Sequence, residues 1–309
     1  SASRWAAGLW NPISFKRITA HEKINEYLAA LEDFFKNWNP ILGDSHCHFQ
    51  TLLRIFPDQT YANDWDVKSE QPRLSQLLDV SKQTPKEWKH PWGMGSVHQT
   101  GWMNVPAFLT IASNYIKKHH RYESAHFDWK AIHLENGKIT YQEEDFDKII
   151  FCTGLFPIPS LDWKIPIIPN KGHLLEIHAE SLSDENIMHY GNFCIPLGNK
   201  KFRIGSTYEW EESSSEISQN IVNELQENFS SHCEVPYSLE RAYVGHRPTV
   251  KDRNPVIGFI HDQPEIGFFN GLGTKGILQG PYMAKTLVDY LQNSISIPKV
   301  YDVNRLLRS

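Results

Sequence analysis

The stretch Phe268–Pro281 reads FFNGLGTKGILQGP, and it places three glycines between an apolar run and a helical pattern. Glycine tolerates positive φ angles and lets another group approach the main chain closely. The free N–H groups at the start of the following helix favour a negatively charged partner. This stretch therefore predicts a strand, a glycine loop and a helix that together cradle an anion or a cofactor. An ordinary turn with convenient glycines is the alternative.

Five further segments accompany the glycine loop in a characteristic order. They are SRWAAGLWNP (Ser3–Pro12), DKIIFCTGLF (Asp147–Phe156), NKGHLLEI (Asn170–Ile177), FRIGSTYEW (Phe202–Trp210) and GHRPTVKDRNPVIG (Gly245–Gly258). With the glycine loop they resemble the FAD-dependent oxidoreductases of the D-amino-acid oxidase, glycine oxidase and sarcosine oxidase superfamily. The resemblance implies an α/β fold, α+β overall, in which a doubly wound FAD-binding domain is interleaved with an antiparallel β-sheet substrate domain.

The resemblance also divides the chain. It implies an FAD-binding domain made of residues 1–40, 100–157 and 245–309, and a substrate domain made of residues 41–99 and 158–244. Members of the superfamily begin with a βαβ unit of roughly 30 residues whose GxGxxG loop holds the ADP part of the cofactor. This sequence contains no GxGxxG and no methionine at position 1. We therefore expect a fragment that lacks its first βαβ unit.

The composition excludes several classes of partner. The net charge is −5 and hydrophobic residues make up 40% of the 309 residues. A slightly acidic chain has no basic field for nucleic acid, and no apolar run approaches the roughly 18 residues of a spanning helix. We expect neither a nucleic-acid nor a membrane partner, and the sequence indicates no oligomeric state.

The cysteines and histidines indicate no metal centre. The four cysteines are far apart and form no CxxC pair, so we expect a reduced, cytoplasmic setting. His46, Cys47 and His48 are potential ligands, but alternate strand residues face opposite sides and no second ligand cluster is nearby.

Periodicity and capping residues predict the helices. Thr19 and Glu22 match a capping box before a helix that extends to about Trp38. Asn104 is the predicted N-cap of a second helix, with Pro106 in its first turn. Two more helices are expected, near 215–229 and from the glycine loop to about Leu291. Strands are expected at 124–134, 138–142, 148–152, 172–177, 192–196, 201–207, 256–260 and 266–269.

By resemblance, several residues contact the cofactor. The segment that lies along the flavin ring supplies Ser3, Arg4, Ala7, Gly8 and Leu9. Phe127 and Asp128 lie near the adenine. At Thr153 and Gly154 the main chain approaches the cofactor closely. The glycine loop supplies Gly271, Leu272, Gly273, Thr274, Lys275 and Gly276. Its helix N-terminus, helped by Lys275, would stabilise negative charge on the reduced ring. The branch with covalent flavin has a cysteine where this chain has Gly245, so noncovalent FAD is expected.

The resemblance places a carboxylate-binding arginine at Arg247. A planar guanidinium can hold a substrate carboxylate through two parallel charge-assisted hydrogen bonds. A structural ion pair with Asp252 is the alternative role. Tyr208 and Tyr243 are candidate catalytic-pocket residues because tyrosine can pack on a substrate and donate a hydrogen bond; both could equally be ordinary sheet residues.

These features predict an enzyme that oxidises the C–N bond of a small amine or amino acid by hydride transfer to FAD. Its partner is then a small molecule that carries a carboxylate. An FAD-dependent 2-hydroxy-acid dehydrogenase is the first alternative, and it would need a base such as His246 or His173. The second alternative is an inactive, truncated remnant.

Overall fold

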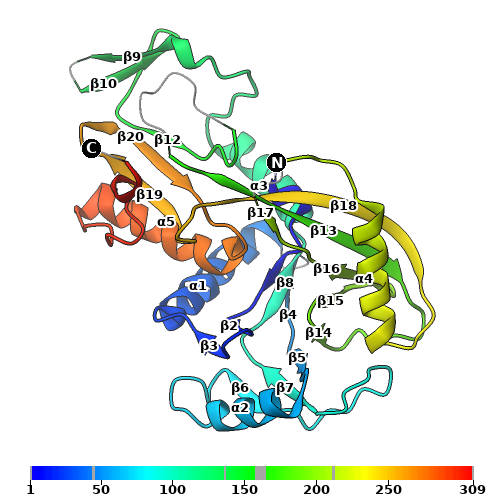
Figure 1. The fold of residues 1–309 in the computed structure, drawn as a ribbon. Helices are drawn as coiled ribbons and strands as arrows, with labels where there is room; N and C mark the ends of the chain where they lie inside the picture. The colour runs from blue at the N-terminus through cyan, green and yellow to red at the C-terminus, as the bar shows by residue number, and fades with distance from the viewer. Residues whose placement is uncertain (1, 44–45, 136, 157–164, 211–212, 308–309) are drawn as a thin grey trace.

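The computed structural model describes residues 2–43, 46–135, 137–156, 165–210 and 213–307. Figure 1 shows one large sheet on one side of the molecule and a smaller sheet packed with two long helices on the other. The α/β class is confirmed. The domain boundaries stay a prediction, and the boundary at 157/158 lies outside the described residues.

The large sheet has nine strands in the order β17-β13-β16-β15-β14-β5-β7-β6, with β18 also pairing with β13. Its strands are β5 (Leu52–Ile55), β6 (Leu78–Val80), β7 (Met94–Val97), β13 (Ile168–His178), β14 (Ile187–His189), β15 (Phe193–Gly198), β16 (Lys201–Gly205), β17 (Glu209–Trp210) and β18 (Ser238–Thr249). Two distant parts of the chain therefore build one sheet. Their junction is the parallel pair β5–β14.

The two faces of this sheet have different coverings. Helix α4 (Gln219–His232) buries Val222 and Leu225 in one cluster with Leu175 and Ile177 of β13. Because successive strand residues point to opposite faces, Asn170 and Gly172 point away from α4. Arg247 of β18 is paired with Asn170, so its side chain lies on that second face.

The small sheet carries the glycine loop. It has the order β12-β20-β19, built from β12 (Ile149–Phe151), β20 (Gln263–Asn270) and β19 (Val256–Ile260). β12 and β20 run parallel. The loop after β20 leads into α5 (Gly276–Asn293), which packs against α1 (Ile24–Leu42) in the main hydrophobic core.

Short elements complete the structure. They are η1 (Ala2–Trp5), β1 (Leu9–Trp10), β2 (Ile13–Ser14), β3 (Thr19–Ala20), β4 (Cys47–Phe49), α2 (Gln59–Ser69), β8 (Gly101–Met103), η2 (Trp129–Ala131), β9 (Ile132–Glu135), β10 (Lys138–Tyr141), β11 (Glu144–Phe146) and η3 (Val303–Leu306). The strand predicted at 124–134 is mostly irregular. Only its last residues join the β9–β11 sheet.

The helix predictions had mixed outcomes. Helix α3 (Val105–His119) begins as predicted, because the Asn104 side chain accepts a hydrogen bond from the backbone N–H of Ala107. The capping box at Thr19 is wrong. Thr19 pairs with Ser14 in the β2–β3 hairpin, and α1 begins at Ile24 without a side-chain cap.

The described residues contain neither a membrane-spanning helix nor a metal-binding cluster. No helix there combines the length and apolar character needed to cross a membrane. No group of three or more His, Cys, Asp or Glu side chains there is placed to hold a metal ion.

Candidate functional site

Arg247 lies at the centre of the candidate site. Its Nη1 donates to the side-chain oxygen of Asn170 at 2.8 Å and to the backbone carbonyl of Thr207 at 3.3 Å. Its Nη2 donates to the Ser206 hydroxyl at 2.6 Å. These contacts extend the side chain across β13 toward the segment between β16 and β17.

Gly172 provides the space for this side chain. A Cβ atom on Gly172 would lie 2.4 Å from Nη2 of Arg247, which is too close for real atoms. Glycine inside a strand often marks such a close approach. The sequence analysis did not identify Asn170, Gly172, Ser206 or Thr207 as site residues. The glycine within the strand NKGHLLEI was the available signal.

The charge of Arg247 has no acidic partner among the described residues. Burial lowers the pKa of its guanidinium, although the nearby Tyr208 acts in the opposite direction. The alternative role of Arg247, a structural ion pair with Asp252, is wrong. That carboxylate instead accepts from Arg305, at 2.9 Å from Nε and 3.2 Å from Nη2.

Arg247 has hydrogen-bonding capacity to spare. A guanidinium has five N–H groups, and the three hydrogen bonds above use three of them. The Nε–H and one N–H of Nη2 have no partner among the described residues. Two such donors are what a carboxylate needs for bidentate binding.

The two candidate tyrosines differ in their surroundings. Tyr208 is exposed, and the guanidinium of Arg247 lies 4.8 Å from its ring centre. Tyr243 is buried, and its hydroxyl donates to Oε1 of Glu176 at 3.3 Å. Tyr208 is therefore placed to contact a ligand of Arg247, whereas the Tyr243 hydroxyl is already used within the protein.

The glycine loop lies next to this arginine. The backbone N–H of Gly273 donates to the carbonyl of Pro248, the residue after Arg247, at 3.0 Å. Gly271 and Gly273 have φ angles of +71° and +54°, which favour glycine. Among the described residues, no side-chain cap hydrogen bond is made at the N-terminus of α5, so its first N–H groups can serve another partner. Lys275 at this terminus is half-buried, and burial lowers its pKa.

The parallel pair β12–β20 places a second glycine beside the loop. The ends of both strands meet at one edge of the small sheet, and Gly154 follows β12 there. The Asn270 side chain donates to the carbonyl of Gly154 at 2.9 Å and accepts from the N–H of Gly271 at 2.8 Å. The predicted segments Thr153–Gly154 and Gly271–Gly276 are thus held together by one asparagine.

The N-terminal segment covers the same face of the large sheet. A Cβ on Gly245 would lie 3.0 Å from Cβ of Trp5, so Trp5 packs closely on β18, whereas the preceding Ser3 and Arg4 are exposed. Nη1 of Arg203 donates to the carbonyl of Ala7 at 3.0 Å. Gly8 has a φ of +84°, and its carbonyl accepts from Met103 N–H at 2.9 Å.

The predicted adenine contacts lie farther along the small sheet. The ring of Phe127 stacks on Tyr141 with centres 4.7 Å apart and also packs against Phe151 of β12. The Asp128 side chain accepts from the N–H of Lys130 at 3.0 Å. The structure therefore brings the other predicted segments around Arg247 and the glycine loop, and connects Phe127 to them through β12.

Neither candidate histidine base faces this site. His246 neighbours Arg247 in β18, so its side chain points to the other face, where Nε2 contacts the carbonyl of Ser214 at 2.9 Å. His173 is fully buried on that other face, with a partner at each ring nitrogen.

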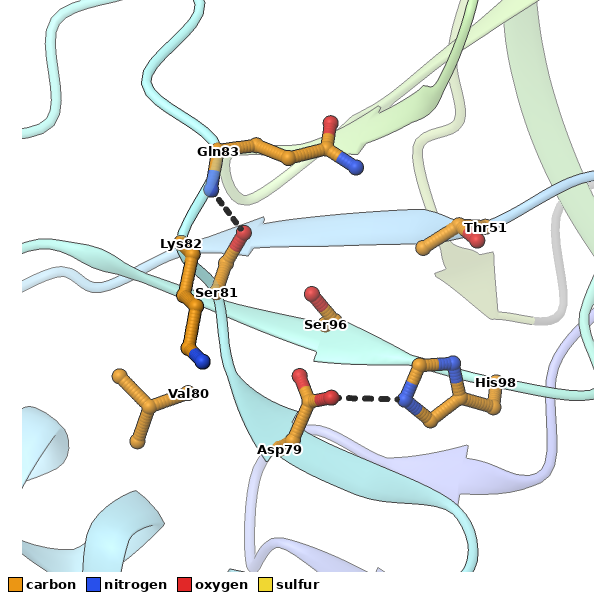
Figure 2. Close-up of a pocket in the computed structure, with 8 residues that line it drawn as sticks. All are labelled: Thr51, Asp79, Val80, Ser81, Lys82, Gln83, Ser96 and His98. Atoms are coloured by element: carbon orange, nitrogen blue, oxygen red, sulfur yellow. Dashed lines mark hydrogen bonds and ion pairs between the residues drawn. The ribbon is translucent and has the colours of Figure 1, made fainter.

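One cavity lies far from Arg247. It has a volume of about 300 Å³ beside β5, β6 and β7, at the opposite end of the sheet order from β18. Figure 2 shows its ionisable pair, His98 and Asp79, hydrogen-bonded to each other at 3.0 Å. A cavity of about 270 Å³ is closer, because its lining includes Trp210, the strand partner of Asn170. Lys251 and Arg253 also line this second cavity and make it cationic.

Known proteins share this architecture. The family model described as FAD dependent oxidoreductase (DAO) matches residues 1–290, and the chain belongs to this family. The structure is similar to glycine oxidase from Geobacillus kaustophilus, with a TM-score of 0.79 and 15% identity over 100% of this chain and 89% of that one. Glycine oxidase from Bacillus cereus has a TM-score of 0.76 and 18% identity over 100% and 88%.

A third similar structure is iminodiacetate oxidase from Chelativorans sp., with a TM-score of 0.76 and 12% identity over 97% of this chain and 89% of that one. At these identities the likeness shows a shared fold.

The family membership shows an FAD-dependent oxidoreductase, and the residues present fit that cofactor. The uncapped α5 terminus and the positive-φ glycines are suited to a negatively charged, flat partner close to the main chain.

Proposed function

We propose that this protein oxidises the C–N bond of a small amine or amino acid that carries a carboxylate. One observation carries the proposal: Arg247 lies beside the glycine loop with no acidic partner among the described residues and with two N–H groups unused. A partly buried cation without a counter-ion is costly, and a substrate carboxylate would neutralise it.

The residues of the chain would act mainly by positioning. FAD, when bound, supplies the redox chemistry by accepting hydride. Asn170, Ser206 and the Thr207 carbonyl hold the guanidinium in one orientation, so a bidentate carboxylate would be held at one angle. Tyr208, next to the guanidinium, would pack on the bound substrate. The α5 terminus and Lys275 would stabilise negative charge on the ring.

The 2-hydroxy-acid alternative has less support. Oxidation of a hydroxyl needs a base to take its proton. Both histidines considered for this role point to the sheet face opposite Arg247. An amine substrate needs no such base once it is neutral, which agrees with the side chains around Arg247.

Anaerobic mixing with candidate substrates tests the proposal. FAD bound to the protein should be bleached by at least one carboxylate-bearing amine, such as glycine, sarcosine or iminodiacetate. Matched hydroxy acids, such as glycolate, should bleach it far more slowly. Absorbance near the flavin maximum measures the rate. Faster bleaching by the hydroxy acids would contradict amine oxidation, and FAD that no member of either group reduced would support the inactive alternative.

The attachment of FAD is a separate prediction. Because Gly245 stands at the position of the flavin-linking cysteine, acid precipitation of the FAD-loaded protein should release the yellow colour into the supernatant. Absorbance of the two fractions measures the release. Colour that stayed with the pellet would show a covalent link elsewhere in the chain.

A further inference from the structure

We propose that His173 is a positioning residue for Arg247, although its side chain lies on the opposite face of the sheet. It would act through the segment Ser206–Glu209, which contacts Arg247 on one side and His173 on the other. The inference rests on the proposed function, because carboxylate binding by Arg247 is the property that His173 would support.

The first side of this segment faces the arginine. Ser206 accepts from Nη2, the Thr207 carbonyl accepts from Nη1, and the Tyr208 ring lies 4.8 Å from the guanidinium carbon. Three consecutive residues therefore set the orientation of the guanidinium. A shift of this segment would move all three contacts together.

The second side of the segment is held by His173. The backbone N–H of His173 donates to the Thr207 hydroxyl at 2.9 Å, and Nδ1 lies 3.0 Å from Oε1 of Glu209. The other ring nitrogen, Nε2, accepts from the backbone N–H of Ser218 at 3.0 Å. One buried ring thus connects the segment to β13 and to the residue before α4.

These partners require one protonation state. Because Ser218 donates to Nε2, that nitrogen carries no proton, and the single ring proton lies on Nδ1, directed at Glu209. Protonation of Nε2 would replace the hydrogen bond from Ser218 with two donors facing each other. The arrangement therefore holds only while His173 is neutral.

The surroundings favour the neutral ring. Burial lowers the pKa of His173, and the nearby Lys171 lowers it further, whereas Glu209 raises it. His246 of β18 lies on the same face, opposite Lys171, and the buried Tyr190, Cys194 and Cys233 belong to the hydrophobic cluster of this face. The pKa of His173 in the folded protein is below the ordinary value of about 6.5. Its hydrogen bonds to Glu209 and Ser218 are therefore fully formed above pH 6.5. This stabilisation of the segment is lost as the pH falls through the lowered pKa of His173.

Hydrogen–deuterium exchange tests the positioning without any ligand. His173→Leu should speed exchange in peptides that cover 206–210, because it removes the bond to Glu209 and the acceptor for Ser218. His173→Asn keeps a donor near the position of Nδ1, so exchange should return part of the way. The matched control is His178→Leu, which changes a half-buried histidine at the far end of β13. Unchanged exchange in His173→Leu would overturn the inference.

Titration of the FAD-loaded protein with acetate tests the consequence for Arg247. His173→Leu should weaken acetate binding about five- to tenfold at pH 8, the loss that one or two hydrogen bonds predict. His173→Asn should recover part of the affinity, and His178→Leu should bind like wild type. Wild-type affinity should fall as the pH is lowered from the ordinary histidine pKa of about 6.5 through the lowered pKa of His173, and the fall should be absent in His173→Asn. Equal affinity in all variants would contradict the inference.

The two arms separate this inference from the proposed function. If Arg247→Ala bound acetate as tightly as wild type, the role of Arg247 as carboxylate ligand would be wrong. The exchange measurement would still report whether His173 holds the segment. If Arg247→Ala lost acetate binding while His173→Leu kept it, the role of Arg247 as carboxylate ligand would stand and the role of His173 would fall.

Discussion

Replacing Arg247 with alanine is expected to lower kcat/KM for a carboxylate-bearing amine by roughly 30- to 1000-fold, or about 2–4 kcal/mol. The loss follows from removing a charge pair that is partly shielded from water. The bound FAD should keep its absorbance spectrum, because Arg247 contacts Asn170, Ser206 and Thr207 rather than the glycine loop itself. Stopped-flow reduction of the flavin gives the rate, and the absorbance spectrum gives the flavin content.

Arg247→Lys is the informative companion. Lysine keeps the positive charge but has no planar fork, so substrate binding should return in part. The angle of the substrate would stay poorly defined, and the remaining defect should appear mainly in kcat. A stable, flavin-replete Arg247→Ala protein with undiminished reduction by its best carboxylate substrate would exclude this role for Arg247. Joint loss of thermal stability and flavin would instead indicate a structural role.

Gly172→Ala should displace the guanidinium of Arg247 while leaving the arginine itself unmutated. The added methyl would lie 2.4 Å from Nη2 and 2.7 Å from Nη1, so the guanidinium must move. The nearest atoms belong to the end of a flexible side chain, and the fold should therefore survive. A displacement of about 1 Å can cost about 100-fold in rate, and we expect a loss of kcat/KM of this order.

Gly280→Ala is the matched control. Gly280 lies inside α5, and a Cβ there would meet no atom within 4 Å apart from its chain neighbours and the nearby backbone of its own helix. Alanine should raise stability there by up to about 1 kcal/mol and leave activity unchanged. Steady-state kinetics and melting curves of both variants make the comparison. Normal kinetics in Gly172→Ala would show that Arg247 can work from a second position, whereas a collapsed melting temperature would show that β13 itself does not tolerate the methyl group.

The sequence was sufficient for several local elements and for the family. Glycines in FFNGLGTKGILQGP permit a loop with positive φ angles, and the structure has such angles at Gly271 and Gly273. Asn104 and Pro106 start α3 as predicted, because a cap depends on only a few neighbouring residues. The same local argument failed at Thr19. Pairing with Ser14 involves the hairpin around it, which the capping pattern does not contain.

Only the tertiary structure decided what surrounds Arg247. Whether it pairs with Asp252 depended on Arg305, a residue 53 positions away from that aspartate. Its true partners come from β13 and from the segment after β16, and strand pairing brings them together.

The strand alternation likewise placed His246 and His173 on the far face of the sheet. Sequence separation carries no information about such contacts, because their geometry is set by register and by which sheet face is buried. The candidate site residues Arg247 and Tyr208 can thus be named from the sequence of this protein, whereas their partners, faces and free hydrogen-bond donors follow from the packing of distant strands.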